Sequence, residues 1–367
     1  MYFTTIQTAI LITLSISSAI HLLFQIFHLL RFKKIIKTES KSTHDSVSII
    51  ICSQNNAIEL DENLTSFLDQ NYPDFEVIVV DNGSTDNTED VVKILQQRYS
   101  NLRLSKIPRD EKFQHNKKLA QTIGIKAAKN NKLLFSNPSC QPTNDQWLNN
   151  FMKSWTKGVL IAYSNFENKK GFWFNMRKYH LLQQQLRFAS YASTNKAFAG
   201  DGDNLGYLKS DFFANKGFAK HAHFEAGYDH LMIHQLAKQS GVSISLSPFT
   251  KMVSLSKNPY EKWNKKNANL YSILKNINKG IRYLLYTETS NKIILLTLLC
   301  YISVYEKLFL FSGIIISIHL VIHTYNYKIV TRHLKEENLF LSSYVFSILM
   351  PFIKLYLYIR NLIFSIH

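Results

Sequence analysis

The chain has 367 residues and a formal net charge of +17, from 43 lysines and arginines against 26 aspartates and glutamates. The lysines are spread along the chain without a helix-turn-helix, zinc or RNA-binding signature, so we expect no nucleic-acid partner. Attraction to anionic lipid and phosphate accounts for the charge more simply. The cysteines, Cys52, Cys140 and Cys300, are far apart and lack the spacing of a metal or redox motif, so we expect no disulfide framework.

The chain begins with an apolar run over residues 1–31 that has no charged side chain before Arg31. About 20 apolar residues suffice to cross a bilayer, so this run predicts a transmembrane anchor. A basic linker, residues 32–45, follows the anchor, and the positive-inside rule places its lysines in the cytoplasm. A cleaved signal peptide has its basic residues before the apolar run, so we expect this anchor to be kept.

The soluble part, residues 46–280, is long enough for one α/β domain with a large core. Short apolar runs alternate in it with segments of helical periodicity. The expected strands are 47–52, 76–80, 102–107 and 132–135, and the expected helices are 59–69, 89–99, 118–129 and 228–240. This alternation predicts a doubly wound, mostly parallel sheet that collects its ligand-binding loops at one edge. The loops are expected at Ser53, Asp81, 110–117 and 136–141.

A polar, glycine-bearing turn follows the second expected strand and begins at Asp81. At the carboxyl edge of a parallel sheet, this side chain can accept hydrogen bonds from the base or ribose of a nucleotide. Asp86 or Asn87 can cap the helix that follows. From this turn alone, a plain strand, turn and helix cap with no ligand is an equally good interpretation.

Three further apolar runs make up the C-terminal part. Two of them, within residues 283–326, are separated by a charged turn and predict a pair of transmembrane helices. Residues 327–338 are then expected to form a cytosolic loop. The third run, residues 339–367, contains Pro351 and Lys354, so we expect it to lie along the membrane interface or to form a third C-terminal membrane helix, and we favour the interface.

Several motifs follow one another in the soluble part. They are the strand and loop at 47–56, Asp-Asn-Gly-Ser-Thr-Asp at 81–86, Asn-Lys-Lys-Leu-Ala at 116–120, Gly-Asp-Gly-Asp-Asn-Leu-Gly-Tyr at 200–207, and Phe-Phe-Ala-Asn-Lys-Gly-Phe at 212–218. In this order, and between apolar ends, they resemble a membrane-anchored family 2 glycosyltransferase with the nucleotide-sugar A-type fold. The resemblance implies an α/β domain that binds a nucleotide-sugar donor.

The resemblance also implies two groups of binding residues. The nucleotide sugar would be held by Ser53, Asn55, Asp81, Asn82, Ser84, Lys117, Asn137 and Ser139. The acceptor or the diphosphate would be held by Asp203, Asn204, Trp263, Lys265 and Lys266. The tryptophan and its lysines stand where the family has a tryptophan and an arginine-rich cluster, and the alternative is that they face lipid head groups.

The metal-binding motif of the family departs from its usual form here. The family holds Mg²⁺ or Mn²⁺ with an Asp-x-Asp after the fourth strand, because such hard cations need carboxylate oxygens. This chain has Asn137, Pro138, Ser139 and Cys140 at that place. Asn137 and Ser139 offer neutral oxygens only, so the resemblance implies a weak, degenerate metal site.

The motif that supplies the general base is also changed, to Gly-Tyr-Asp-His-Leu at 227–231. Asp229 is the one carboxylate that this motif keeps, and a direct displacement needs only one base. His230 is the substitute candidate, since an imidazole titrates near neutral pH. Glu225 lies just upstream. The alternative is that Asp229 only orients a helix and His230 faces solvent.

These observations predict an inverting glycosyltransferase of the inner (cytoplasmic) membrane, with its domain in the cytoplasm and a lipid-linked or cell-envelope glycan as acceptor. The altered motifs leave a second hypothesis open, a catalytically degenerate relative that serves as a membrane binding or scaffold partner of another glycosyltransferase. A transporter is not expected, because the apolar segments contain no pair of acids to mark a substrate path.

Overall fold

A seven-stranded mixed sheet forms the centre of the domain in the computed structural model, which describes residues 5–38, 45–109, 116–224, 227–306 and 308–364. Its strands are β1 (Val47–Ser53), β2 (Phe75–Asn82), β3 (Leu102–Ile107), β4 (Lys132–Ser136), β6 (Val159–Ala162), β8 (Leu205–Leu208) and β9 (Val242–Ser245). Their order is β3-β2-β1-β4-β8-β6-β9. Only β8 pairs antiparallel with its neighbours, so the expected mostly parallel α/β fold is confirmed.

A small second sheet lies beyond the end of β4. Its strands are β5 (Cys140–Pro142), β7 (Ser164–Phe166) and β10 (Met252–Ser254), in the order β5-β10-β7. Two short 3₁₀ helices, η1 (Ala219–His221) and η2 (Pro248–Thr250), lie in loops. The second sheet fixes the loop that starts at Asn137, because that loop leads directly into β5.

Helices cover both faces of the central sheet. Successive residues of a strand point to opposite faces. Ile49 and Ile51 therefore pack in the core beneath α2 (Ala57–Leu68), α3 (Thr88–Gln96) and α5 (Trp147–Ser154). Ile50 packs on the other side, in the core beneath α4 (Lys117–Ala127), α7 (Lys209–Ala214) and α8 (Tyr228–Ser240). The two apolar layers hold the carboxyl ends of β1, β2 and β4 in a fixed arrangement.

A glycine lets α4 approach the sheet closely. A Cβ atom at Gly124 would lie 2.6 Å from the Cγ2 atom of Ile50 and 2.9 Å from that of Val80. Such distances are too short for a side chain, so only glycine fits at this contact. The close packing fixes the start of α4, which carries Lys117.

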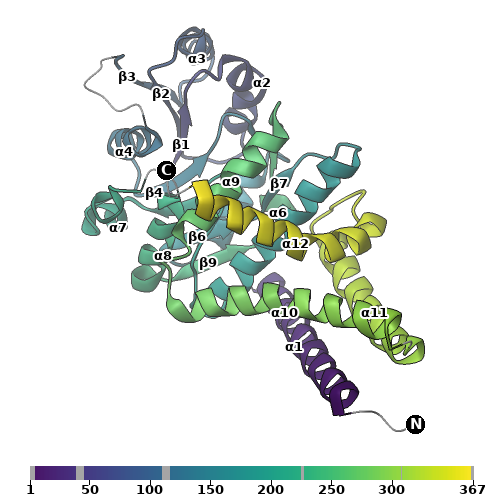
Figure 1. Cartoon of the computed structure of the whole chain (residues 1–367). Coiled ribbons are helices and arrows are strands. Elements are labelled where there is room, and N and C mark those ends of the chain that lie inside the picture. Colours follow the sequence, from purple (N-terminus) through teal and green to yellow (C-terminus); the bar gives the residue numbers. More distant parts are fainter. Residues whose placement is uncertain (1–4, 39–44, 110–115, 225–226, 307, 365–367) are drawn as a thin grey trace.

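Long helices lie on the side of the domain away from β3. They are α1 (Thr5–Ile36), α6 (Phe172–Ala192), α9 (Pro259–Ile273), α10 (Lys279–Val304), α11 (Phe309–His333) and α12 (Phe340–Phe364). Figure 1 shows α1 projecting from the domain, with α10 crossing it and α12 lying over α6 and α9. Among the described residues, α1, α11 and residues 340–361 of α12 are long and apolar enough to cross a membrane.

Some helix boundaries differ from the expected ones. The helix α1 continues to Ile36, into the expected linker, and α11 continues to His333, so the connection to α12 is shorter than residues 327–338. The helix α10, expected as a span, is long enough to cross a membrane but is not among the helices that are also apolar enough. The charged residues explain this, since Lys279, Arg282 and Glu288 lie in the first half of α10 and Lys292 follows.

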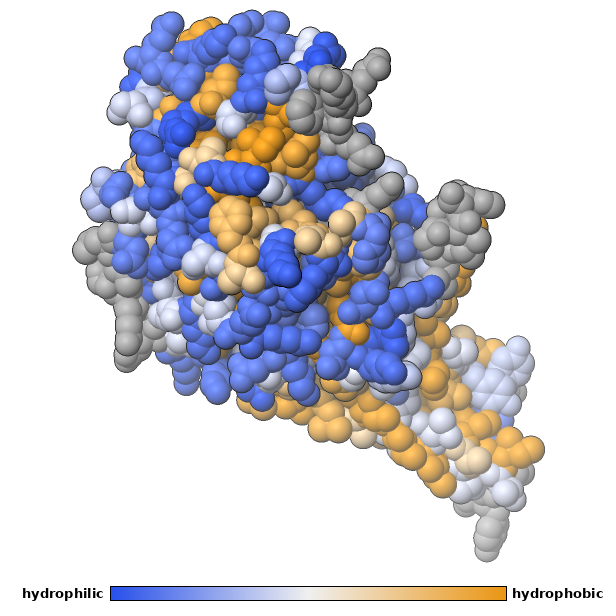
Figure 2. Space-filling view, turned by 90° about the vertical axis from the view of Figure 1, so that its left-hand side faces the viewer, coloured by the Kyte–Doolittle hydropathy of each residue, from blue (hydrophilic) through white to orange (hydrophobic). Residues whose placement is uncertain are grey.

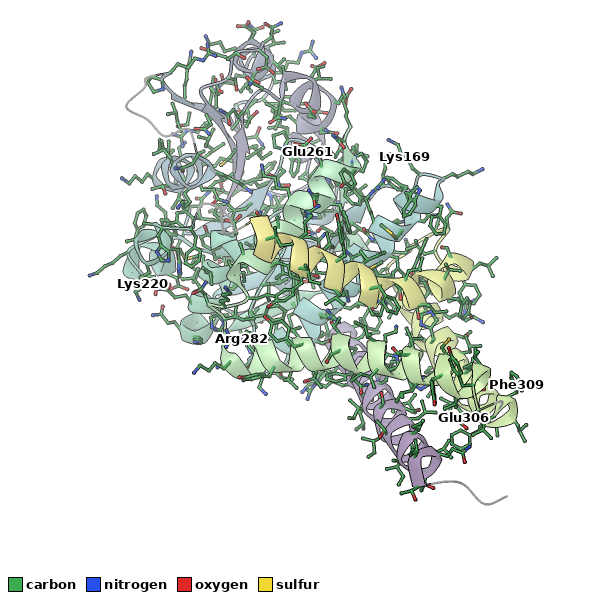
Figure 3. The ribbon with its side chains drawn as sticks, in the orientation of Figure 1. Lys169, Lys220, Glu261, Arg282, Glu306 and Phe309 are labelled. Carbon is green, nitrogen blue, oxygen red and sulfur yellow. The ribbon has the colours of Figure 1, made fainter. Side chains whose placement is uncertain are left out.

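The far ends of α1, α10 and α11 lie together. The side-chain amide of Gln7, near the start of α1, donates to Glu306 after α10. Figure 3 shows Glu306 and Phe309 at the tip of the α10–α11 hairpin, away from the sheet. In Figure 2, hydrophobic residues cover the projecting helices and hydrophilic residues cover most of the visible face of the domain. Exposed apolar side chains such as Leu310 and Leu341 fit a lipid environment better than water.

A buried ion cluster connects the α11–α12 turn to the domain. The carboxylate of Glu336 is fully buried and lies 2.7 Å from the Nζ atoms of both Lys178 and Lys251. The hydroxyl of Tyr163 donates to the same carboxylate at 2.9 Å. Two ammonium groups and one hydroxyl thus compensate the buried charge of Glu336, and this turn is fixed to α6 and to the strand region of the domain.

Candidate functional site

Polar side chains lie where β1 and β2 end. Ser53 pairs in register with Asp81, and both side chains are buried together with Asn82. One carboxylate oxygen of Asp81 accepts a hydrogen bond of 2.9 Å from the backbone N–H of Ser84. Within the described parts of the chain, the Ser53 hydroxyl and the side-chain amide oxygen of Asn82 have no hydrogen-bond partner. These two groups can serve a ligand at the carboxyl edge of the sheet.

The loops after β1 and β2 are held together by Asn55. Its backbone N–H donates to the Ser84 hydroxyl at 3.0 Å, and its side-chain oxygen accepts from the N–H of Thr85 at 2.7 Å. Its φ angle of 55° is one that asparagine adopts more readily than most residues. Asp86 accepts from the first N–H of α2, that of Ala57, at 2.9 Å and also from that of Thr88 at 3.1 Å. Asn55 and Ser84 therefore shape the edge.

A lysine and an aspartate from two helices meet beside the next loop. The side chain of Asn116 caps α4 by accepting from the N–H of Leu119 at 2.9 Å. Lys117, the first residue of α4, has its Nζ atom 3.6 Å from the Oδ2 atom of Asp229 in the first turn of α8. A Cβ atom at Gly202 would lie 3.5 Å from that oxygen and 3.9 Å from that nitrogen. The pair thus lies against the loop that leads into β8.

The charge of Lys117 depends on these neighbours. Burial lowers its pKa, but carboxylates raise it more, first that of Asp229 and then those of Asp203 and Asp201, so the pKa is raised overall. Asp229 itself is only partly buried, with 20% of its side chain exposed, so its carboxylate remains accessible to an incoming hydroxyl group.

His230 is turned toward the protein. Its ring lies 6.0 Å from the ring of Phe188, and its Nδ1 atom is buried without a hydrogen-bond partner among the described residues. Burial lowers the pKa of His230, and the charge of Asp229 only partly opposes this. The imidazole is therefore neutral at pH 7, and it serves packing better than proton transfer.

Asp203 is the centre of a charge cluster. Its carboxylate is buried, with one oxygen accepting from the side-chain amide of Asn137. The other oxygen lies 3.0 Å from the Nζ atom of Lys262 and 2.7 Å from that of Lys266. Burial raises the pKa of Asp203, but the two lysines lower it far more. Lys266 also pairs with Asp201; burial lowers the pKa of Lys266, but the carboxylates of Asp201 and Asp203 raise it more.

The same lysines reach the loop where a metal motif is expected. The Nζ atom of Lys262 donates to the hydroxyl of Ser139 at 3.1 Å and lies 3.3 Å from the sulfur of Cys140. Among the described residues, no group of three or more His, Cys, Asp or Glu side chains is placed to hold a metal ion. Since the carboxylates of Asp201 and Asp203 already carry lysine ammonium groups, this arrangement does not fit Mg²⁺ or Mn²⁺.

Three of the residues expected to hold the acceptor or the diphosphate do not belong to the charge cluster around Asp203 and Lys266. The side-chain amide of Asn204 donates to the carbonyls of Tyr163 and Thr250, at 2.8 and 2.7 Å, and so holds the fold. Trp263 is buried and donates to the Nδ1 atom of His180 at 3.0 Å. Lys265 is exposed on α9. Glu225 and residues 110–115 lie outside the described residues.

Two members of the cluster are additions to the expected set. Asp201 accepts from the hydroxyl of Ser164 at 2.7 Å and from the amide of Gln185 at 2.8 Å, besides its contact with Lys266. Lys262 contacts Asp203 and Ser139. A sequence signal exists for Lys262, because it lies four residues before Lys266 and both therefore point from one face of a helix.

The fold and the polar edge together define an α/β protein whose polar side chains gather where its parallel strands end. A mannosyltransferase from Pyrobaculum calidifontis, solved with GDP-Man and Mn²⁺, has a similar fold, with a TM-score of 0.56, 17% identity, and coverage of 91% of this chain and 98% of that one. Residues 48–214 match the family described as glycosyl transferase family 2. Residues 48–214 are therefore similar to family 2 glycosyltransferases, and the mixed sheet is GT-A-like, so the predicted fold is confirmed.

Two curated proteins are similar over shorter stretches. Glycosyltransferase AglE of Haloferax volcanii is 35% identical over 109 residues, which are 29% of this chain and 34% of that protein. An uncharacterized glycosyltransferase of Nostoc is 42% identical over 52 residues, 14% of this chain and 16% of that protein. The similarity thus spans about a third of the first relative and less of the second.

Proposed function

We propose that the chain is a membrane-associated, inverting glycosyltransferase that moves a sugar from a nucleotide-sugar donor to an acceptor hydroxyl. The observation that carries the proposal is the pair of Asp229 and Lys117 beside Gly202, at the edge where β1 ends in Ser53 and β2 contains Asp81. Asp229 is a partly exposed base, and it lies next to an edge suited to a nucleotide. The similar fold of a mannosyltransferase solved with GDP-Man supports this class of donor.

The reaction follows from the roles of these groups. Asp81 accepts hydrogen bonds from the donor's base or ribose, with Ser53 and Asn82 completing the contact. The carboxylate of Asp229 takes the proton of the acceptor hydroxyl as its oxygen attacks the anomeric carbon. The bond from that carbon to the diphosphate oxygen breaks on the opposite side, so the configuration inverts and the nucleoside diphosphate leaves with the electron pair.

The departing diphosphate needs positive charge near it. Among the described residues, Lys117, Lys262 and Lys266 are cations of this edge, and an ammonium group can stabilise a phosphate as a point charge. A bound Mg²⁺ or Mn²⁺ would supply the same stabilisation in a site that fits it. The donor atoms around Asn137 and Ser139 do not fit such an ion, so we assign the stabilisation of the diphosphate to the lysines.

The proposed location is the cytoplasmic face of the inner membrane. Lys33 and Lys34 lie in the last turn of α1, at the end that joins the domain, and the positive-inside rule favours the cytoplasm for such an end. Three apolar helices support attachment to the membrane. A lipid-linked or cell-envelope glycan is then the natural acceptor, because a membrane-bound site meets it at a high effective concentration.

One observation favours a second candidate function. The three lysines at the edge face three carboxylates, Asp201, Asp203 and Asp229, so the described residues of the cluster have no surplus of positive charge for a diphosphate. A domain of this kind that has lost catalysis would act as a binding or scaffold partner of another glycosyltransferase. It would co-purify with an active transferase and show no transfer of its own.

A transfer assay tests the first proposal. Membranes containing the full chain are incubated with a panel of radiolabelled UDP- and GDP-sugars, and label in the lipid and glycan fractions is counted. Replacing Asp229 by Asn should lower the transfer rate about 10²- to 10⁴-fold, since one general base is lost. Replacing Asp90, an exposed acid on α3, by Asn is the matched control. Transfer that survives Asp229→Asn would remove Asp229 as the base.

A further inference from the structure

A polar cavity lies among the long helices, apart from the edge just described. It has a volume of about 120 Å³ and is lined by residues of α1, α6, α10, α11 and α12. One water needs roughly 10–15 Å³ of such space, so the cavity can hold a group larger than a single water. Its charged lining consists of three basic side chains, Arg187, Lys292 and Lys354, and one acid, Glu288, together with His21, His28 and His323.

The single carboxylate in the described lining of this cavity is engaged through one of its two oxygens. The Nε and Nη2 atoms of Arg187 lie 3.0 and 2.8 Å from one oxygen of Glu288. Within the part of the chain that the structure describes, the Nζ atom of Lys292 donates only to the hydroxyl of Ser347, at 3.3 Å. Lys354 has no hydrogen bond or ion pair with any described residue. The basic side chains therefore outnumber their anionic partner, and the cavity suits an anion.

The hydroxyl group of Tyr327 is a second polar group of the cavity that could bind a ligand. The hydroxyl of Tyr327, which lines the cavity, is buried and has no hydrogen-bond partner among the residues that the structure describes. Lys354 itself lies in α12, an apolar helix. An ionisable residue within such a helix is costly, and it commonly faces a functional cavity. A phosphate oxygen would satisfy both the ammonium group and the hydroxyl.

An apolar cavity of about 200 Å³ adjoins the polar one. The two share Arg187, Thr289 and Lys354 as lining residues. The rest of the second cavity is mostly apolar and includes Leu285 and Leu355. A molecule with a phosphate head and a hydrocarbon chain matches this pairing, whereas a free phosphate would leave the apolar cavity empty.

The helix α6 connects these cavities to the charged edge of the sheet. Arg187 and Phe188 line the apolar cavity, while Gln185 donates to Asp201 at 2.8 Å. Phe188 also lies against the ring of His230, the neighbour of Asp229 in the chain. A lipid held in the cavities would thus lie next to the elements that carry the proposed base.

We infer that the polar cavity binds the phosphate or diphosphate head of a lipid, with Arg187, Lys292 and Lys354 around its oxygens and the adjoining apolar cavity taking the start of its chain. That this lipid carries the acceptor of the transfer rests on the proposed function; the binding site itself does not. Inorganic phosphate and neutral lipids are the alternatives that the experiment must separate.

The experiment measures lipid retention by the full chain in nanodiscs of phosphatidylcholine. The probe is a long-chain polyprenyl monophosphate, compared with the polyprenol of equal length and with millimolar inorganic phosphate as competitor. Native mass spectrometry should detect the bound polyprenyl phosphate and not the polyprenol. Lys354→Gln and Lys292→Gln should each weaken retention about tenfold or more, because each removes a hydrogen bond to a charged group. Lys328→Gln, at an exposed position of α11, is the matched control.

Several outcomes would overturn the inference. They are equal retention of polyprenol, full displacement of the lipid by inorganic phosphate, and unchanged retention in both cavity variants. A thermal unfolding curve for each variant identifies loss of fold, and Arg187→Lys, which keeps the charge, should retain more lipid than Arg187→Gln. Nucleotide binding is measured on the same samples. Lipid binding without nucleotide binding would refute the proposed function alone, and the reverse result would refute this inference alone.

Discussion

At the scale of single residues, the site is governed by Asp203 and the two lysines that neutralise it. A buried carboxylate is costly unless it is paired, and Lys262 and Lys266 provide the pairing. Where a hard cation would need free carboxylate oxygens, these ammonium groups already lie 3.0 and 2.7 Å from Asp203. The lysines thus take the place that a metal ion would need.

This account predicts a gain of metal binding when one lysine is removed. In Lys266→Gln, Asp201 and Asp203 lose their shared cation, so the melting temperature should fall, and Mn²⁺ should restore part of it by binding the freed carboxylates. A metal at 100 times its dissociation constant stabilises by about 2.7 kcal/mol. Differential scanning fluorimetry with and without Mn²⁺ measures the effect, with the exposed Lys265→Gln as control. Equal stabilisation of the unaltered protein by Mn²⁺ would contradict the account.

The sequence predicts some of these side chains better than others. Residues that follow a strand directly, such as Ser53 and Asp81, could be assigned to the edge because the strand pattern fixes their position. The engagement of Asn204 with two backbone carbonyls could not be foreseen, since its partners, Tyr163 and Thr250, are distant in the chain. The contact of Lys262 with Asp203 could not be foreseen either, since the two residues are far apart in the chain, although the spacing of Lys262 and Lys266 places both on one face of α9.

At the scale of elements, the junction of α6 and α9 positions the lysines of the site. Trp263 lies between Lys262 and Lys266 in the chain and donates to the Nδ1 atom of His180 on α6. That nitrogen must be unprotonated to accept the bond. Burial lowers the pKa of His180 well below its usual value, and nearby positive charges lower it further.

The stability of the protein should therefore depend on pH through His180. Above pH about 6.5 the imidazole is neutral in both the folded and the unfolded chain. Below that value the unfolded chain binds a proton that the folded chain does not, so the free energy of unfolding falls by up to about 1.4 kcal/mol per pH unit. Denaturant unfolding between pH 5.5 and 7.5 should show a smaller slope in His180→Gln.

A matched variant separates the contribution of His180 to the pH dependence of stability from the effect of removing any histidine. His223 is exposed, so His223→Gln should leave the pH dependence of the unfolding free energy as it is in the unaltered protein. An identical slope in His180→Gln and the unaltered protein would show that His180 takes up its proton equally in both states, against the expectation from its burial.

Helices and strands of the domain were predictable because local patterns determine them. The expected strand 102–107 agrees with β3, and the expected helix 228–240 agrees with α8. The extension of α11 to His333 could not be predicted, because it depends on tertiary packing. Val330 and Leu334 are buried in one core cluster with Tyr179 of α6. Apolar composition alone cannot show where such a helix leaves the membrane.

At the scale of the whole molecule, the buried cluster at Glu336 joins the long C-terminal helices to the domain. Glu336→Gln would leave the ammonium groups of Lys178 and Lys251 buried without their carboxylate. Removing one partner of a buried ion pair typically costs about 3–5 kcal/mol. We expect a loss of that size in the free energy of unfolding, measured in detergent. The control is Glu337→Gln at the exposed neighbouring position, and equal stability of the two variants would contradict the role of Glu336.

The central claim is that the edge formed by β1, β2 and α4 binds a nucleotide without depending on a metal ion. Isothermal titration of the full chain in detergent with UDP and with GDP, each with and without Mn²⁺, tests it most directly. We predict that one of the two nucleotides binds in the absence of Mn²⁺ and that Asp81→Ala abolishes or strongly weakens this binding. Absence of binding by both nucleotides, with and without Mn²⁺, would contradict the claim.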